Sequence, residues 1–202
     1  LVGTQMVTKG HDFPKVTLVG VISADLSLNC PDFRAGEITF QLLSQVAGRT
    51  GRGSFPGRVI IQTFNPSHYA ITAARDHDYR RFFSHERNLR RQLSYPPFSA
   101  LANLRFLGNN RPRTEEIARQ MGAKILNILR RQSRGKKDVE VLGPVEAPMA
   151  KLKGKYRQQM LIKSRRSSYL NQLLKEVHKC SAQILSASGV RLIIDVDPYQ
   201  MM

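Results

Sequence analysis

The sequence predicts an α/β fold in two parts: a parallel sheet with helices in residues 1–95, then a β-α-β-β-α-β domain in residues 96–202. Two apolar runs flank a helical pattern in the first half, which is typical of a parallel sheet. The second half alternates strand and helix patterns in the order of a split β-α-β unit. Pro96 and Pro97 lie between the halves. Because proline has no N–H to donate and disfavours helix in the residue before it, this pair ends the preceding helix.

In the first half, the apolar runs at 16–24 and 57–64 predict strands that are buried on both faces. Residues 38–47 between them carry apolar side chains at helical spacing. Ser67 is the expected N-cap of the next helix. A longer helix is predicted from Asp78, with aromatic side chains on one face and arginines on the other.

The second half has a more regular pattern. Helices are predicted at 114–131, with Thr114 as the cap, and at 167–186. The predicted strands cover 100–106, 139–145, 155–163 and 191–196. The strand at 139–145 is expected to be short because Gly143 and Pro144 lie at its end. This order is the ferredoxin-like arrangement, so the sequence predicts a partial parallel α/β unit followed by a ferredoxin-like domain.

Charge is the strongest feature of the composition. The 202 residues carry 32 Lys and Arg against 15 Asp and Glu, a formal net charge of +17. Residues 101–202 hold 20 of the basic and 8 of the acidic residues, a net charge of +12. Such an excess predicts a polyanionic partner. No apolar run approaches the roughly 18 residues of a membrane-spanning helix, so nucleic acid is favoured over a membrane.

The segment 45–52, with the sequence QVAGRTGR, is the most informative motif. Arg49 and Arg52 are three residues apart, so on a helix they share a face and their guanidinium groups can reach one triphosphate. Gly48 leaves room for a close approach. The alternative is a solvated helix end, where arginines interact favourably with the helix dipole.

A polar segment at 3–13 lies directly before the first strand. Its hydroxyl groups, its small residues and Lys9 are suited to contacts with phosphate oxygens. Asp12 is placed to accept a hydrogen bond from a ribose or to orient an arginine. The alternative is an ordinary polar loop.

Taken in order, these two motifs resemble motifs V and VI of superfamily 2 helicases. Within that superfamily the stretches GTQM, KGHDFP, ISAD and QVAGRTGRG are similar to those of the replication-restart helicases. The second half continues the likeness with LSYPPFSALANLRF, LGPVEAPMAKLKGKYRQQMLIK and IIDVDP. The resemblance therefore covers nearly the whole chain, and it is weakest at about 108–138.

The resemblance implies an ATP-dependent 3′→5′ DNA helicase that binds branched and single-stranded DNA at stalled forks and starts primosome assembly. Residues 1–95 would be the C-terminal part of a RecA-like helicase lobe 2, and residues 96–202 a DNA-binding domain. The implied compartment is the bacterial cytoplasm, near the nucleoid. Single-strand DNA-binding protein and primosome proteins are implied partners.

By motif matching, the resemblance also assigns roles to individual residues. Arg49 and Arg52 would face the nucleotide, and Gln45 would couple nucleotide to DNA. Gly10 and Asp12 would lie on the nucleotide side of motif V, and Thr4 on its DNA side. The phosphate-binding GxxxxGK[ST] loop, the acidic Mg²⁺ box and the zinc-binding cysteine pairs of the family are absent from this sequence. ATP, Mg²⁺ and zinc are therefore expected only with the full-length protein, and this chain alone, which we interpret as a fragment, is expected to lack ATPase activity.

Basic residues gather at 151–166, which contains seven Lys and Arg and no acidic residue. On a strand, alternate side chains point the same way, so this pattern predicts contacts with successive phosphates without sequence reading. The alternative is a solvated basic surface. A second basic cluster follows the helix at 114–131. The predicted DNA-binding residues in this half are Lys151, Lys153, Lys155, Arg157, Lys163 and Arg165.

Other chemistry-bearing residues favour structural roles. The histidines lack acidic or cysteine partners at ligand spacing, and Cys30 and Cys180 are far apart, so we predict no metal site and no disulfide. Asp195 and Asp197 are expected to pair with nearby arginines. Two other functions stay open: a stand-alone nucleic-acid-binding or scaffold module without nucleotide chemistry, and a branch-migration helicase, which the C-terminal motifs disfavour.

Overall fold

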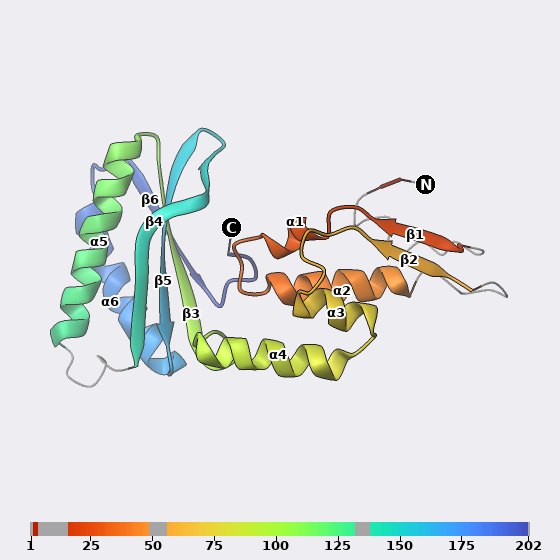
Figure 1. The fold of residues 1–202 in the computed structure, drawn as a ribbon. Helices are drawn as coiled ribbons and strands as arrows, with labels where there is room; N and C mark the ends of the chain where they lie inside the picture. The colour runs from red at the N-terminus through yellow and green to blue at the C-terminus, as the bar shows by residue number, and fades with distance from the viewer. Residues whose placement is uncertain (1, 4–15, 49–55, 132–137, 202) are drawn as a thin grey trace. The chain divides into compact units, whose positions relative to one another are not determined.

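The computed structural model describes residues 2–3, 16–48, 56–131 and 138–201 and shows an α/β chain of two compact units (Figure 1). The first unit is Leu1–Leu89 and the second is Arg90–Met202, so the division falls inside a helix. Pro96 and Pro97 lie in the second unit. Each unit has its own hydrophobic core.

The first unit pairs β1 (Leu18–Val21) with β2 (Arg58–Ile61) in parallel, as the alternating pattern predicts. The prediction that these strands are buried on both faces is wrong for the described residues. Leu18 is 58% exposed and Ile60 is 55% exposed, whereas Val21 and Ile61 pack against the core. The described helices thus cover one face of this two-stranded sheet.

The described residues of this unit form four helices: α1 (Asp25–Leu28), α2 (Ala35–Ala47), α3 (Tyr69–Arg75) and most of α4 (Tyr79–Gln92). Aromatic side chains join them, with the ring of Phe40 stacked on Phe82 at a centroid distance of 4.2 Å. The hydroxyl of Tyr69 donates to the Glu86 carboxylate at 2.6 Å. Helix α2 approaches this pair closely at Gly36, where a Cβ atom would lie 2.2 Å from the Tyr69 hydroxyl. A side chain at Gly36 would therefore displace the Tyr69–Glu86 pair.

The second unit is a four-stranded antiparallel sheet in the order β4-β5-β3-β6, with helices α5 and α6 on one face (Figure 1). Its elements follow the predicted order: β3 (Ala100–Gly108), α5 (Arg111–Arg131), β4 (Val139–Leu152), β5 (Lys155–Ser164), α6 (Ser167–Leu185) and β6 (Val190–Val196). The core between sheet and helices includes Leu104, Phe106, Met160, Ile162 and Leu173, all fully buried. These predictions came from apolar residues spaced at period 2 in the strands and at period 3.6 in the helices. The buried residues of the structure follow the same two periods.

Two predicted helix caps are wrong. The cap of α3 is His68, whose Nδ1 accepts from the backbone N–H of Ala70 at 3.2 Å, while the Ser67 hydroxyl bonds Asn65. Helix α5 begins at Arg111, and Thr114 is a buried residue within it. The Asn110 side chain accepts from the Arg113 N–H at 3.0 Å and so fills the capping role. Both errors come from choosing one hydroxyl residue among several polar residues near a helix start.

The His68 cap is expected to make the stability of the first unit depend on pH. Burial, and then the charge of nearby His85, lower the pKa of His68 from its usual 6.5, against a weaker opposing effect of Glu86 and Asp25. The unfolded chain then binds the proton more readily than the folded one. Stability is fully present above about pH 6.5 and is lost as the pH falls through the lower pKa of the folded state.

The check is the melting temperature between pH 7.5 and 5.5 for the wild type and His68→Asn. Asparagine keeps a capping oxygen and does not titrate in this range. The wild type should lose more stability on acidification than the variant. An identical pH dependence in the two proteins would exclude His68 as the source.

Candidate nucleic-acid interface

The end of the β4–β5 hairpin carries three exposed lysines. The prediction that Lys151, Lys153, Lys155 and Arg157 alternate along one strand is wrong, because the chain reverses at Lys153 and Gly154. Both turn residues have positive φ, 47° and 80°, which is the backbone of a type I′ hairpin turn. The ammonium of Lys151 lies 4.8 Å from the centre of the Tyr156 ring. The lysines are therefore gathered around a tight turn rather than spaced along a line.

Strand β4 is much longer than predicted, and its added length forms one arm of this hairpin. It continues past Gly143 and Pro144, with shifts of register between Leu142 and Val145 and between Glu146 and Lys151. Strand β4 lies at the edge of the sheet, where a proline without an N–H and an interrupted ladder are tolerated. The edge strand thus extends to carry the lysines.

Two of the predicted DNA-binding residues are buried instead. Lys163 is 5% exposed, and its ammonium donates to the Leu93 carbonyl at 3.0 Å, pairs with Glu140 at 3.2 Å and lies 4.1 Å from the Tyr95 ring centre. Arg157 is 4% exposed. In this fold Lys163 has a full set of protein partners, so its geometry supports a structural role. Arg165 is exposed directly after β5.

A set of polar side chains that sequence reasoning missed lies on the helix-free face, the face of the four-stranded sheet opposite α5 and α6. Alternation in β3 places Leu104 and Phe106 in the core and Asn103 and Arg105 on the helix-free face. Arg105 pairs with Asp195 at 3.1 Å, which confirms the expected ion pair for that acid. Asp197 instead accepts from the Leu101 N–H at 3.4 Å. The strand period could have placed Arg105 here, but not its neighbours on other strands.

Most of the residues predicted in the two helicase-like motifs lie outside the described residues: Gly10, Asp12, Arg49 and Arg52 on the nucleotide side, and Thr4 and Lys9 on the DNA side. So do the basic residues at 134, 136 and 137. Of that prediction the structure places Gln45 in the last turns of α2 and Gly48 at its C-cap. A Cβ atom at Gly48 would meet no atom closer than 3.6 Å, so packing among the described residues does not require glycine there.

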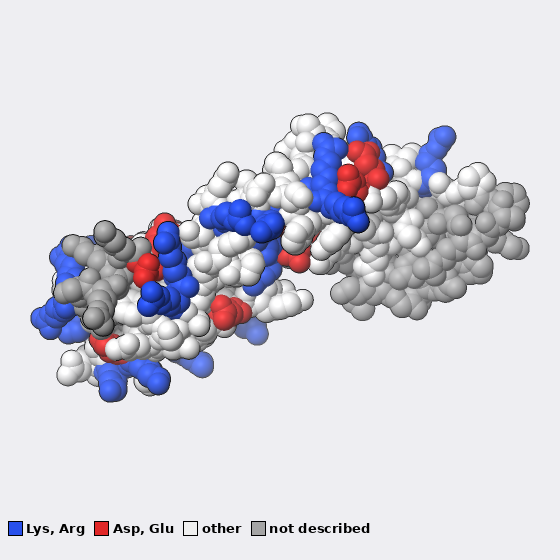
Figure 2. Space-filling view, turned by 90° about the horizontal axis from the view of Figure 1, so that it is seen from below, with Lys and Arg blue, Asp and Glu red and all other residues white. Residues whose placement is uncertain are grey.

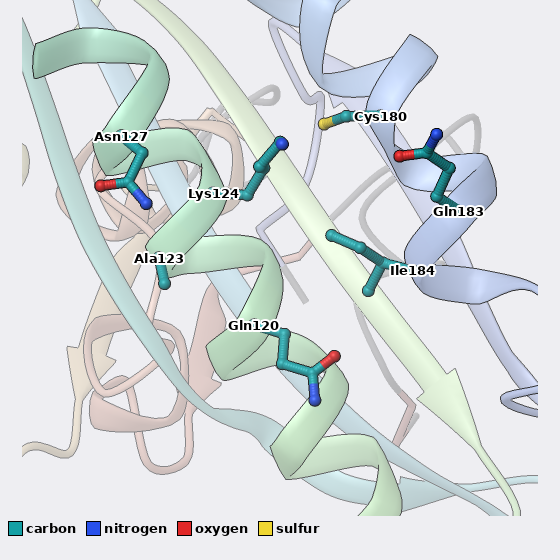
Figure 3. Close-up of a pocket in the computed structure, with 7 residues that line it drawn as sticks. All are labelled: Gln120, Ala123, Lys124, Asn127, Cys180, Gln183 and Ile184. Carbon is teal, nitrogen blue, oxygen red and sulfur yellow. The ribbon is translucent and has the colours of Figure 1, made fainter. Parts of the chain in front are cut away.

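A shallow groove of about 340 Å³ lies between α5 and α6 (Figure 3). It is lined by Gln120, Lys124 and Asn127 from α5 and by Cys180, Gln183 and Ile184 from α6. Burial raises the pKa of the Cys180 thiol, so this sulfur stays protonated and unreactive at neutral pH.

Within the described part of the chain, no group of three His, Cys, Asp or Glu side chains could hold a metal ion. No helix in the same part is long and apolar enough for a membrane span.

Basic side chains are spread over the surface seen in Figure 2, and acidic side chains form smaller patches among them. Together with the topology, this surface defines the class of the chain: an α/β protein with a small parallel sheet followed by a basic antiparallel unit. Residues 91–199 match the model of the family described as primosomal protein N C-terminal domain. The chain belongs to the PriA family of replication restart proteins.

Individual relatives agree with this assignment. The replication restart protein PriA of Bacillus subtilis is 45% identical over the whole chain, which corresponds to 24% of that relative. The PriA protein of Synechocystis is 41% identical over the whole chain and 23% of the relative. That of Rickettsia felis is 41% identical over 98% of the chain and 29% of the relative. The chain thus spans about a quarter of the length of these relatives.

Proposed function

We propose that this chain provides the nucleotide-sensing and DNA-binding parts of an ATP-dependent 3′→5′ DNA helicase that restarts replication. The single observation that carries the proposal is the 45% identity to a replication restart protein across the whole chain. In this proposal residues 1–95 complete a RecA-like lobe 2, and residues 96–202 form a ferredoxin-like domain that binds branched and single-stranded DNA. Single-strand DNA-binding protein and primosome proteins are the proposed protein partners.

The first unit would act on ATP bound elsewhere in the full-length protein. Arg49 and Arg52 would stabilise the charge that develops on the transferring phosphate, as arginines do in other nucleoside triphosphatases. Gln45 and Gly48 lie at the end of α2, directly before these arginines. A stand-alone binding or scaffold module would have no use for two arginines at this spacing, and this feature favours the helicase.

The second unit would bind DNA through its phosphates. The lysines at the β4–β5 turn are exposed, and none of them forms an ion pair with another described residue. Binding through such groups releases counterions and carries no sequence information. The proposed binding is therefore selective for DNA shape and indifferent to its sequence.

Replacing the three hairpin lysines together, Lys151→Ala, Lys153→Ala and Lys155→Ala, is expected to weaken DNA binding strongly. If each contacts one phosphate, the slope of log affinity against log salt should become less steep by about 2–3 on duplex DNA. Fluorescence anisotropy with a labelled fork across a salt series measures both quantities. Stability should be unchanged because these side chains are exposed.

The matched control removes the same charge from the helical side of the unit: Lys124→Ala, Lys175→Ala and Lys179→Ala, all exposed. This variant should keep the affinity within a few-fold and nearly the original slope. Equal losses in the two triple variants would show that net charge alone, and not the hairpin, determines binding.

A further inference from the structure

Three arginines come together at one end of the helix-free face. In the register of the sheet, Leu107 of β3 lies opposite Arg157 of β5 and Arg191 of β6. Arg105, two residues before Leu107, lies opposite Gln159. Since side chains two apart on a strand share a face, Arg105, Arg157 and Arg191 all belong to the helix-free face. These three residues, on three adjacent strands, are called the arginine triad below.

Arg157 is the unusual member of the triad. Its side chain is 4% exposed, yet its Nη1 atom makes no hydrogen bond to any described residue. The Oε1 atom of neighbouring Gln159 is also buried without a hydrogen-bond partner in the described part of the chain. Burial, and then the positive charge of Arg105, lower the pKa of Arg157. A buried donor atom of a cationic group that lacks an acceptor destabilises a fold, and an anion that reaches the guanidinium would reduce that cost.

The other two members of the triad are accessible to solvent. Arg191 is exposed, and the Arg105 side chain is 22% exposed. Two carboxylates lie on this face. Asp195 pairs with Arg105, and Glu140 pairs with Lys163 at the other end of β5. Neither acid forms an ion pair with Arg157 or Arg191. The positive charge at the Arg157–Arg191 end of the face is therefore not balanced by these carboxylates.

The face also indicates how a nucleic acid would be held. On β3, β5 and β6 the positions that point to this face carry arginine, lysine, leucine, isoleucine, asparagine, glutamine or aspartate, and no aromatic ring. These strand positions therefore offer no ring on which a base could stack. Guanidinium groups bind phosphate oxygens with two parallel hydrogen bonds, which suits the DNA backbone.

We propose that the arginine triad is a phosphate-binding site for the DNA backbone, in which Arg157 reaches one phosphodiester from beneath while Arg105 and Arg191 hold it or its neighbour at the surface. This inference rests on the proposed DNA-binding function and assigns it to a surface distinct from the hairpin turn. Lys155 lies two residues before Arg157 on β5, so its side chain points to the same face and extends it toward the hairpin.

The test measures binding of a labelled fork by the full chain across a salt series, for Arg191→Gln, Arg157→Gln and the control Arg119→Gln. Arg119 has a side chain 69% exposed and lies on α5, on the opposite side of the sheet. Each triad variant should bind about tenfold more weakly at low salt, with a salt slope reduced by about 0.9. Arg119→Gln should bind like the wild type. Arg191 is exposed, so its variant keeps the fold even where Arg157→Gln does not.

Wild-type affinity and slope in a folded Arg191→Gln, together with unchanged binding by Arg157→Gln, would overturn the inference. If the wild type itself binds no DNA, the proposed function fails first. If the wild type binds and only the hairpin variant loses affinity, the inference alone fails.

A second readout needs no variant. In the wild-type chain, the side-chain Nε–H NMR signal of Arg157 should shift and saturate on titration with a twelve-nucleotide oligothymidine. The signal of Arg119 should stay in place. An Arg157 signal that does not move at saturating oligonucleotide would equally overturn the site.

Discussion

Arg49→Ala is expected to lower the DNA-stimulated ATPase rate by about 10³-fold when this chain is joined to the rest of a PriA relative. The relevant protein is a chimera with the Bacillus subtilis relative, in which this chain replaces the matching segment, 24% of that relative's length. The physical reason is that a guanidinium positioned at the transferring phosphate stabilises charge that is absent from the ground state. The loss should therefore appear in kcat, with a small change in KM.

The matched control for this variant is Arg58→Ala, which removes an exposed arginine of β2 in the same unit. It should leave the ATPase rate unchanged. A rate for Arg49→Ala equal to that of the control would refute the nucleotide-facing role of Arg49. The chain without its helicase partner lobe is expected to show no turnover, because its sequence contains no phosphate-binding GxxxxGK[ST] loop.

Lys163→Ala is expected to lower the free energy of unfolding by about 2–3 kcal/mol. The buried ammonium of Lys163 holds the Leu93 carbonyl, the Glu140 carboxylate and the face of the Tyr95 ring. Its removal leaves the Leu93 carbonyl without this donor and a gap beside the ring. Glu140 has a side chain 53% exposed and regains water, so the loss of that ion pair adds little.

Urea unfolding followed by circular dichroism measures this effect, and Lys155→Ala serves as the exposed control on the same strand. Lys163→Met keeps the length of the stem and removes the charge, so it should fall between the wild type and Lys163→Ala. DNA affinity of the folded Lys163→Ala protein should match that of the wild type. A large loss of DNA affinity at unchanged stability would restore the original assignment of Lys163 to the DNA interface.

Local pattern was sufficient for the elements of the second unit. Met160 and Ile162 lie two residues apart on β5, and Leu170, Leu173 and Val177 follow helical spacing on α6. All five are buried. The caps were harder because Asn110 and His68 competed with nearby hydroxyl residues that were equally plausible from sequence. Periodicity is a property of many residues together, whereas a cap depends on one rotamer.

Features set by distant residues escaped prediction. Gly143 and Pro144 signal the end of a strand, yet β4 passes them because it is an edge strand, and strand order is not visible locally. Lys163 and Arg157 are residue types that usually lie on the solvated surface. Only the fold shows that Lys163 is held by Leu93, seventy residues earlier in the sequence. The arginine triad could not be predicted because it depends on how β3 pairs with β5 and with β6. These strands are separated in the sequence by helices or by another strand.

The most direct test of the account is the affinity of the wild-type chain for two forked DNAs of unrelated sequence, measured from about 50 to 300 mM salt. We expect equal affinities for the two sequences and a linear fall of log affinity with log salt, with a slope of magnitude about 3 or more. No binding at the lowest salt, or a clear preference for one sequence with a flat salt dependence, would contradict it.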